Sequence, residues 1–347
     1  MTADSGTIPV FLADVKRRVD AHLVRFFQQK RDHAHTLSEP SLELLDALQE
    51  FTMRGGKRTR PAILRAGQLA IAPASDFTPL LDAAAGLEVL QSYLLVHDDW
   101  MDQDDARRGG TTLHKVFADR TGNAHLGACL AVLSGDLGNA FAIELVCRSA
   151  ATSQHGASAL EVFWAMQRDV VYGQALDLLA YPDVALIQRL KTGSYSVKGP
   201  LLLGAVLAGA SAKQKSALER YAEPAGLAFQ VRDDLLGVFG APALTGKPAG
   251  NDLRAGKRTA LIEELEARVP ERERGPLLAV FGHAEASDAK VNEAIALLEQ
   301  CGAKAAVEAR IHKLAASAQS ALVDADLSDT GRELLEGLVQ LFAQRDH

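Results

Sequence analysis

The sequence has few cysteines and no excess of positive charge. Its 347 residues include three cysteines, Cys129, Cys147 and Cys301, which form neither a C-x-x-C pair nor a zinc pattern with histidine. The formal net charge of −7 argues against a general nucleic-acid binder, because such proteins carry a basic face. We therefore expect reduced cysteines, no zinc site and no nucleic-acid partner.

The chain also lacks a signal-peptide pattern and a long uncharged apolar run. Met1–Ser5 has no basic start leading into an apolar segment, and no apolar run reaches ~18 residues. These features predict a cytoplasmic protein without stable membrane insertion. With 48% hydrophobic residues, the chain can bury a large core in one large domain or two ordinary ones.

A series of alternating β-branched strands is absent as well. Alanine and leucine dominate, and apolar residues recur mostly at three-to-four spacing, which predicts an all-α fold. Residues 84–96 and 201–210 are apolar almost all round, as a helix enclosed by other helices requires. We expect one helical bundle over residues 1–347, with a motif-bearing core at about 50–265 and C-terminal helices at 266–347.

Two aspartate doublets interrupt the apolar helical runs. If 84–101 is one helix, Asp102 shares a face with the first doublet, Asp98-Asp99. Carboxylate oxygens suit Mg²⁺, which proteins commonly hold with one or two carboxylates plus substrate phosphates. A solvated acidic helix end is the alternative, but the apolar surroundings and the second doublet disfavour it. The predicted metal ligands are Asp98, Asp99, Asp102, Asp233 and Asp234.

Basic residues beside glycines form a second set. They occur in Gly55–Pro61 (G-G-K-R-T-R-P), in Arg107-Arg108-Gly109, and at Lys191, Lys247 and Lys257. Arginine offers a planar fork to phosphate, and glycine lets a diphosphate approach the backbone closely. Gly246-Lys247-Pro248 is no Walker A motif, because proline stands where serine or threonine is needed. The pattern therefore predicts diphosphate binding without nucleotide hydrolysis.

Together these motifs resemble those of the trans-isoprenyl diphosphate synthases, the polyprenyl synthetase family, from about Gly55 to Ile262. Gly55–Pro61 is similar to the family's isopentenyl diphosphate segment, and Asp98–Asp102 with Arg107–Gly109 to its first aspartate-rich motif. The resemblance implies an isoprenoid-synthase bundle with a central active-site cavity, and a homodimer. The remaining motifs in family order are Gly173–Asp177, Lys191–Ser196, Phe229–Asp234, Gly246–Pro248 and Gly256-Lys257.

The resemblance also implies a reaction. Mg²⁺ ions would bridge the two aspartate motifs and bind the diphosphate of dimethylallyl, geranyl or farnesyl diphosphate, whose allylic cation the alkene of isopentenyl diphosphate attacks. Gln174 and Asp177 would support the site, and His97 would orient the first motif. The implied catalytic residues are Asp98, Asp99, Asp102, Arg107, Lys191, Thr192, Gln230, Asp233 and Lys257. The implied substrate-binding residues are Lys57, Arg60, Gln91, Arg107, Arg108, Lys191, Thr192, Gln230, Lys247 and Lys257.

One position departs from the family pattern. Gly237 stands where the second motif usually has its third aspartate. Magnesium readily keeps several waters, so we expect an active site in which Asp233 carries most of the second metal position and Gly237→Asp is tolerated. The departure also leaves open a catalytically weak regulatory subunit of a heteromeric prenyl synthase. A class I terpene cyclase is disfavoured by Asp233-Asp234 and by Gly55–Pro61.

Product length depends on the residues before the first motif. Leu94 and Tyr93 lie roughly 6–7.5 Å down the helix axis from Asp98, where a prenyl tail would pass. A single bulky aromatic at Tyr93, with no insertion in the motif, resembles geranylgeranyl diphosphate synthases. The implied product is therefore C20, with a C15 farnesyl diphosphate synthase as the nearest alternative and simple core packing as the alternative role for Tyr93.

Overall fold

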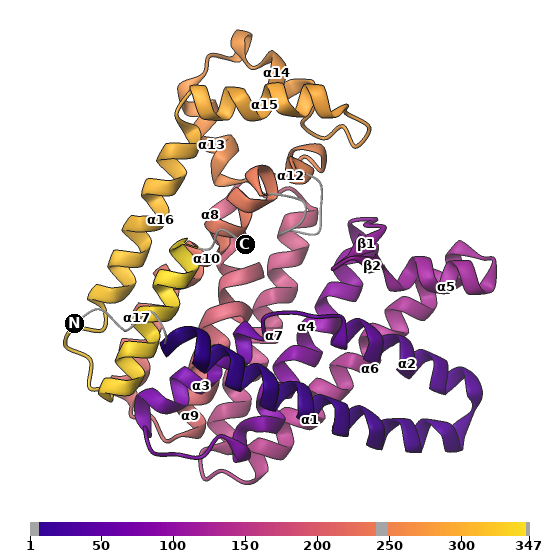
Figure 1. The fold of residues 1–347 in the computed structure, drawn as a ribbon, viewed down its shortest axis with the longest axis vertical. Helices are drawn as coiled ribbons and strands as arrows, with labels where there is room; N and C mark the ends of the chain where they lie inside the picture. Colours follow the sequence, from indigo (N-terminus) through magenta and orange to yellow (C-terminus); the bar gives the residue numbers. More distant parts are fainter. Residues whose placement is uncertain (1–6, 241–248, 345–347) are drawn as a thin grey trace. The chain divides into compact units, whose positions relative to one another are not determined.

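The computed structural model describes residues 7–240 and 249–344, and these are almost entirely helical (Figure 1). Their contacts divide the chain into two compact units, and each is described by itself. Unit 1 comprises Met1–Trp164, Pro200–Lys215 and Leu327–Leu334, and unit 2 comprises Ala165–Gly199, Ser216–Asp326 and Leu335–His347. The predicted all-α class is confirmed, and the single-domain organisation stays a prediction.

Unit 1 contains most of the N-terminal helices and the one strand pair found among the described residues. That pair is an antiparallel hairpin, β1 (Ala106–Arg107) and β2 (Gly110–Thr111), in which Arg107 pairs with Gly110. Its helices are α1 (Thr7–Leu37), α2 (Glu39–Met53), α3 (Thr59–Ile71), η1 (Thr78–Leu80), α4 (Leu81–Met101), α5 (Leu113–Thr121), α6 (Ala124–Ala151) and most of α9 (Gly199–Leu207).

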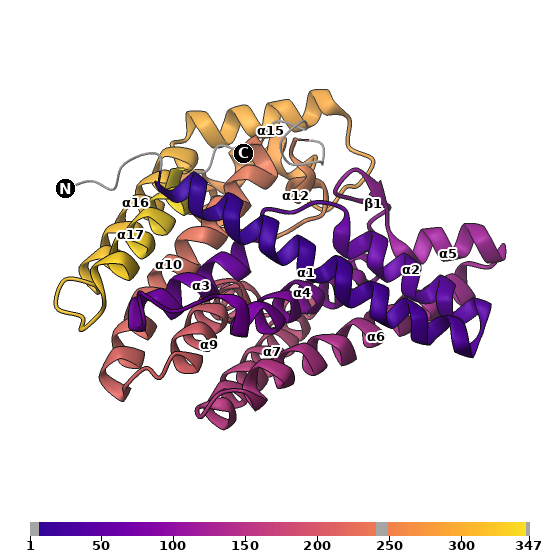
Figure 2. The ribbon, with the colours of Figure 1, turned by 60° about the horizontal axis from the view of Figure 1, so that its bottom comes forward.

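The helix α4 forms the centre of unit 1. It packs against α6, and α1, α2 and α3 also contact it (Figure 2). Small residues allow the closest approaches, since a Cβ added at Gly86 would lie 2.9 Å from Val146 of α6. A Cβ at Gly204 of α9 would lie 2.8 Å from the carbonyl carbon of Leu64 in α3. Residues 83–90 and 201–207 are buried, so the predicted enclosed helices are confirmed there.

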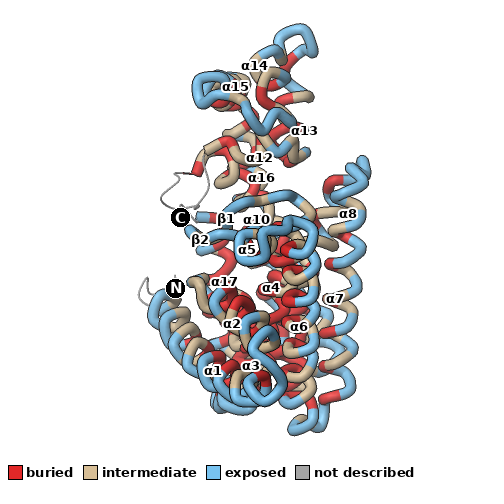
Figure 3. Tube along the Cα trace, turned by 90° about the vertical axis from the view of Figure 1, so that its right-hand side faces the viewer, coloured by how far each residue is buried: buried red, intermediate tan, exposed pale blue. Residues whose placement is uncertain are grey.

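Within the described residues, two helices are apolar and long enough to cross a membrane, judged by length and composition alone. In the segment Thr78–Met101, which includes α4, 67% of the apolar window is buried, as expected of a core helix, whereas in α6 only 33% is buried. Figure 3 shows buried and exposed residues mixed along α6. Its exposed residues include the apolar Leu126, Leu133 and Ile143.

Unit 2 places several short helices beside long ones. In α10, the Tyr221 hydroxyl donates a 2.7 Å hydrogen bond to the Leu335 carbonyl of α17, and the rings of Phe229 and Phe342 meet edge to face at 5.2 Å. The segment η2 (Arg189–Lys198) is a π-helix. Unit 2 holds α8 (Val184–Gln188), η2, α12 (Asn251–Arg254), α13 (Ala260–Arg268), η3 (Glu271–Glu273), α14 (Gly275–Leu278), α15 (Asp288–Gln300) and α16 (Ala303–Ser320), with most of α7 (Gly156–Leu178), α10 (Ala212–Phe239) and α17 (Asp329–Gln344).

Candidate active site

A glycine-rich basic loop joins α2 to α3 in unit 1. Gly55 and Gly56 have φ values of 89° and 111°, a region that glycine enters without the strain of a side chain. Arg58, with φ of 53°, ends the loop and precedes the first residue of α3. A non-glycine residue rarely adopts this conformation, so the surrounding structure must hold Arg58 in place.

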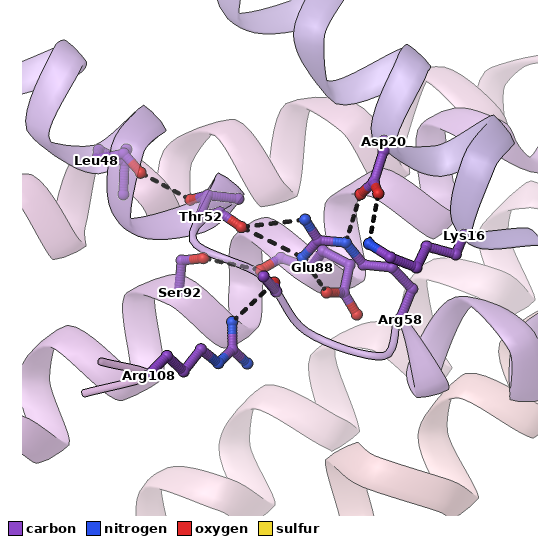
Figure 4. A network of polar contacts seen from close by, with 9 residues as sticks. Lys16, Asp20, Leu48, Thr52, Arg58, Glu88, Ser92 and Arg108 are labelled. Carbon is purple, nitrogen blue, oxygen red and sulfur yellow. Dashed lines mark hydrogen bonds and ion pairs between the residues drawn. The ribbon is translucent and has the colours of Figure 1, made fainter. Parts of the chain in front are cut away.

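Arg58 is held by a buried network rather than exposed to a ligand (Figure 4). Its side chain is 2% exposed, and it donates hydrogen bonds of 2.7 Å to Asp20 of α1 and 2.7 Å to Glu88 of α4. Both terminal nitrogens also donate to the Thr52 carbonyl at 3.2 Å. Two carboxylates thus neutralise this guanidinium, and the central arginine of the basic loop anchors the loop.

Two further arginines, Arg108 and Arg60, lie beside the loop. They are close enough for the positive charge of one to affect the other. The Nη1 atom of Arg108 donates to the Gly55 carbonyl at 3.4 Å, and a Cβ at Gly56 would lie 3.3 Å from the same nitrogen (Figure 4). Burial lowers the pKa of Arg108, and the charge of Arg60 lowers it further, although Glu88 raises it. Crowded guanidinium groups beside glycine backbone favour an anion such as a diphosphate.

Two further predicted residues line this part of unit 1. Lys57 is exposed on the loop, and Gln91 is partly buried on α4. Sequence reasoning missed Arg54, whose Nη1 atom donates to the carbonyls of Thr111 at 2.9 Å and Arg107 at 3.3 Å. Arg54 therefore ties the end of α2 to the β1–β2 hairpin.

The first aspartate motif lies at the C-terminal end of α4. Asp99 is fully buried, Asp98 is partly buried, and Asp102 is the exposed residue that caps the helix. Arg107 of β1 bridges the cluster: its Nε atom donates to Asp99 at 2.6 Å, and its Nη2 atom lies 3.5 Å from Asp98 and 3.2 Å from Asp104. The motif's carboxylates thus already hold one cation, and Asp104 joins a cluster from which sequence reasoning omitted it.

The chemistry of this cluster fits a divalent metal ion. Burial raises the pKa of Asp99 to about 6, although the charge and hydrogen bond of Arg107 lower it. The Oδ2 atom of Asp99 is buried and accepts no hydrogen bond from the described residues. Across 7–240 and 249–344, no three histidine, cysteine or acidic side chains are gathered closely enough to hold a metal ion alone. Magnesium that shares its coordination with phosphates needs no such group.

One turn before the motif, α4 turns an aromatic residue toward α6. The rings of Tyr93 and His97 meet edge to face at 4.8 Å, and His97 Nε2 lies 3.1 Å from the Val132 carbonyl. Glycines make room for both, since a Cβ at Gly135 would lie 2.5 Å from His97 Nε2 and one at Gly138 would lie 3.5 Å from Tyr93 Cβ. His97 is therefore a packing neighbour of the motif. The chain-length role of Tyr93 and Leu94 stays a prediction.

In unit 2, the π-helix η2 carries Lys191 and Thr192. Its backbone passes close to α7, where a Cβ at Gly173 would lie 2.6 Å from Lys191 Cα. The Lys191 ammonium group pairs with the Asp177 carboxylate of α7 at 2.6 Å. Asp177 therefore holds the predicted substrate-binding lysine, and Gly173 lets the two helices approach. π-Helical segments are rare and occur frequently at functional sites.

The second aspartate motif combines one buried and one partly buried carboxyl group. Asp234 is 7% exposed, and both of its oxygens accept hydrogen bonds, from Gln188 at 2.9 Å and from Gln230 at 2.5 Å. Burial raises its pKa to about 7, and the charges of Asp252 and Asp233 add to this effect. Gln230 thus contacts the motif itself, and Gln188 belongs to none of the sequence motifs.

The position of the absent third aspartate is filled from another helix. A Cβ at Gly237 would lie 2.6 Å from Asp252 Cγ and closer still to its Oδ2 atom. A side chain at residue 237 would have to move the Asp252 carboxylate, which is the flexible end of its side chain, so the expectation that Gly237→Asp is tolerated stays a prediction. Lys257 lies 4.0 Å from the other oxygen of Asp252. The predicted substrate residue Lys247 lies outside the described residues.

Comparison with known proteins decides the family. The family model described as Polyprenyl synthetase matches residues 42–298. The chain belongs to the polyprenyl synthetase family. It is 31% identical over 300 residues to a short chain isoprenyl diphosphate synthase of Methanocaldococcus jannaschii, covering 85% of this chain and 84% of that one. It is 30% identical over 338 residues to the geranylfarnesyl diphosphate synthase of Aeropyrum pernix, covering 94% and 99%.

The similarity to a solved structure covers nearly all of this chain. The geranylgeranyl pyrophosphate synthase of Corynebacterium glutamicum, complexed with isoprenyl diphosphate and magnesium, superposes with a TM-score of 0.88 at 33% identity. The match covers 97% of this chain and 99% of that one. The protein therefore has the isoprenyl diphosphate synthase fold and is a prenyltransferase, a short-chain trans-prenyl diphosphate synthase. The relatives' names differ in product, so chain length is a separate question.

Proposed function

We propose that this synthase makes geranylgeranyl diphosphate by condensing isopentenyl diphosphate with dimethylallyl, geranyl or farnesyl diphosphate. The observation that carries the C20 product is Tyr93, a bulky aromatic one turn before the first aspartate motif. Its side chain is partly buried, and burial raises its pKa, so the ring lies away from bulk water. An aromatic ring in this position limits the depth available to a growing apolar chain.

Charged groups support the binding of both substrates, isopentenyl diphosphate and the allylic diphosphate. In unit 1, Lys57, Arg60 and Arg108 form a cationic anion-binding region beside glycine backbone, which suits the diphosphate of isopentenyl diphosphate. Asp98 and Asp99 offer oxygen ligands to magnesium in the same unit. Bound magnesium would neutralise the allylic diphosphate and so promote ionisation of its carbon–oxygen bond.

Unit 2, taken by itself, carries groups suited to stabilising a departing diphosphate. Lys191 is oriented by its ion pair with Asp177, so its charge is fixed before substrate arrives. Asp233 and Asp234 supply carboxylates to magnesium, and Asp234 is positioned by two glutamine amides. The alkene of isopentenyl diphosphate attacks the allylic cation, a carbon–carbon bond forms, and the proton leaves to the departing diphosphate. None of these steps needs a histidine base.

We also propose that the synthase is a cytoplasmic homodimer. The helix α6 is strongly apolar but mostly unburied, and its exposed apolar residues include Leu126 and Leu133, whose spacing of seven corresponds to about two helical turns. Exposed apolar side chains that gather on one helix indicate an interaction surface. A second copy of the chain is the partner that would cover it.

Product chromatography tests the proposal. The purified protein is supplied with Mg²⁺, labelled isopentenyl diphosphate and one allylic primer of C5, C10 or C15, and the products are separated after dephosphorylation. We expect a C20 product from each primer, and Asp98→Ala and Asp233→Ala should each nearly abolish turnover. A product that stops at C15 would identify a farnesyl diphosphate synthase. Failure to extend any primer would support the regulatory-subunit alternative.

A further inference from the structure

The β1–β2 hairpin carries two of the predicted substrate-binding arginines, but its own strands hold it weakly. Each strand has two residues, and an isolated two-stranded hairpin is marginally stable at best in water. The turn between the strands consists of Arg108 and Gly109, whose φ values of 51° and 73° are both positive, as a type I′ turn requires. Asparagine, aspartate or glycine usually stands where Arg108 does, so the surrounding structure must hold this turn.

Arg54, at the C-terminal end of α2, supplies such a contact. Its Nη1 atom donates hydrogen bonds to the Thr111 carbonyl at 2.9 Å and to the Arg107 carbonyl at 3.3 Å. These two carbonyls belong to opposite strands of the hairpin. The guanidinium group also packs against the hairpin backbone, since a Cβ at Gly110 would lie 2.5 Å from Arg54 Cζ. One side chain therefore joins both strands to the end of α2.

The remaining nitrogens of Arg54 are bound to α2. The Nε atom donates to one oxygen of Glu50 at 2.9 Å, and the Nη2 atom donates to the other at 2.5 Å. Glu50 precedes Arg54 by four residues, so the two side chains meet on one side of the last turn of α2. The Arg54 side chain is 14% exposed, and all three of its nitrogens are hydrogen-bonded within the protein. This geometry suits a residue that positions the hairpin and does not itself bind phosphate.

The two arginines of the hairpin differ in how their side chains are held. Arg107 contacts three carboxylates of the first aspartate motif and its surroundings. Arg108 donates to the Gly55 carbonyl at 3.4 Å, which is long for a hydrogen bond (Figure 4). If the hairpin moves, the carboxylates still hold the Arg107 side chain, whereas Arg108 is displaced from the glycine-rich loop. Loss of Arg54 should therefore affect the substrate of Arg108 more than that of Arg107.

We propose that Arg54 is a positioning residue for isopentenyl diphosphate: it holds the β1–β2 hairpin so that Arg108 stays beside the glycine-rich loop. In this role Arg54 acts through the hairpin backbone and makes no contact with the substrate. The inference rests on the proposed function, since Arg108 is a proposed contact of isopentenyl diphosphate. It implies a selective effect, in which the affinity for one of the two substrates depends on Arg54.

Steady-state kinetics with each substrate varied in turn test the proposal. Arg54→Ala should raise KM for isopentenyl diphosphate about tenfold, because the charge-assisted hydrogen bonds that fix the hairpin are lost. KM for the allylic diphosphate should stay nearly unchanged. Arg54→Lys keeps the charge, but an ammonium group cannot reproduce the planar fork that bonds Glu50 and two carbonyls at once. Its KM for isopentenyl diphosphate should therefore rise as well.

A matched control separates positioning from stability. Arg274 of unit 2 makes the same kind of contact, donating to the carbonyls of Val269 at 2.8 Å and Glu266 at 2.6 Å. Arg274→Ala should leave KM for isopentenyl diphosphate unchanged even where its melting temperature falls as far as that of Arg54→Ala. Arg54→Lys keeps a long side chain, so it carries the test if Arg54→Ala fails to fold.

Three results would overturn the proposal: an unchanged KM for isopentenyl diphosphate in Arg54→Ala, an equal rise in KM for both substrates, or an unchanged KM in Arg54→Lys. The last would show that the charge of Arg54 acts and its fork does not. Failure of the unmodified protein to extend any primer would contradict the proposed function instead. Calorimetry of isopentenyl diphosphate binding would then compare Arg54→Ala with the unmodified protein, and equal affinities would overturn the positioning role.

Discussion

Asp99 and Asp234 are buried carboxyl groups. Each is the second residue of its aspartate doublet, and burial raises the pKa of Asp99 to about 6 and of Asp234 to about 7. Groups with such shifted pKa values cluster at functional sites, since burying an ionised carboxylate is costly unless a cation, hydrogen-bond donors or a bound ligand compensates it. The metal-free protein should therefore be less stable than its magnesium-bound, substrate-bound form.

The raised pKa of Asp234 predicts a pH-dependent stability of the metal-free protein. Its folded-state pKa of about 7 exceeds the ordinary value of 3.8, so the folded state retains a proton that the unfolded state releases above about pH 4. Stability from this group is present at low pH and is lost as pH rises through about 7. In chelator, Asp234→Asn should reduce the fall in melting temperature between pH 5 and pH 8. An unchanged fall would contradict the prediction.

Tyr93 controls product length if the C20 proposal is correct. Replacing it with alanine removes the ring that packs beside His97 at the contact of α4 with α6. The products of Tyr93→Ala should shift beyond C20, because a deeper apolar space accepts further isoprene units. Phenylalanine at the same position keeps the ring and should leave the product at C20. The same product ladder in Tyr93→Ala as in the unmodified chain would assign the residue to packing alone.

The sequence was sufficient to predict candidate ligand-binding residues, but it did not reveal the residues that position them. Asp98, Arg60 and Lys191 belong to motifs with recognisable spacing. Gln188 and Asp252 do not, because only the fold brings them to α10: Gln188 lies 46 residues before its partner Asp234, and Asp252 approaches Gly237 from the short helix α12. Glu88 was a signal that could have been used, since an acidic residue inside an apolar helical run needs a buried partner. That partner is Arg58.

The sequence predicts where helices occur, but it does not predict whether a helix is an α-helix or a π-helix. The apolar periodicity around α4 predicted its course through the first motif, and the structure confirms it. The π-helix η2 leaves no comparable pattern, because its form depends on the close passage of α7 at Gly173. The two-residue strands β1 and β2 were likewise missed, since they are too short for an alternating pattern and are held by Arg54.

The contact of α7 with η2 should tolerate no side chain at residue 173. In Gly173→Ala, the new Cβ would lie 2.6 Å from Lys191 Cα, so the backbone that carries Lys191 must move. Overpacking of this kind costs about 1–3 kcal/mol and should also raise KM for the allylic diphosphate. Gly275→Ala is the control, since a Cβ there meets nothing within 4 Å. Equal kinetics and equal melting temperatures in the two variants would refute the expected displacement.

The assembly of the whole molecule is predicted to depend on α6. A charge at Leu133, which is 54% exposed, would face the second copy across the proposed dimer contact. Leu133→Glu should convert a dimer to a monomer in light scattering, because burying an unpaired carboxylate is strongly unfavourable. Val10→Glu, at a 70% exposed apolar residue of α1, should leave the mass unchanged. A dimeric Leu133→Glu variant would exclude α6 as the contact.

The hydrogen-bond network around Arg58 predicts that α1, which carries none of the sequence motifs, affects substrate affinity. One guanidinium ties α1 through Asp20, α2 through Thr52 and α4 through Glu88, and it lies at the end of the glycine-rich loop. The conformation of that loop therefore depends on the packing of all three helices. Trimming α1 past Asp20 should therefore weaken capture of isopentenyl diphosphate, although the removed segment carries none of the predicted substrate-binding residues.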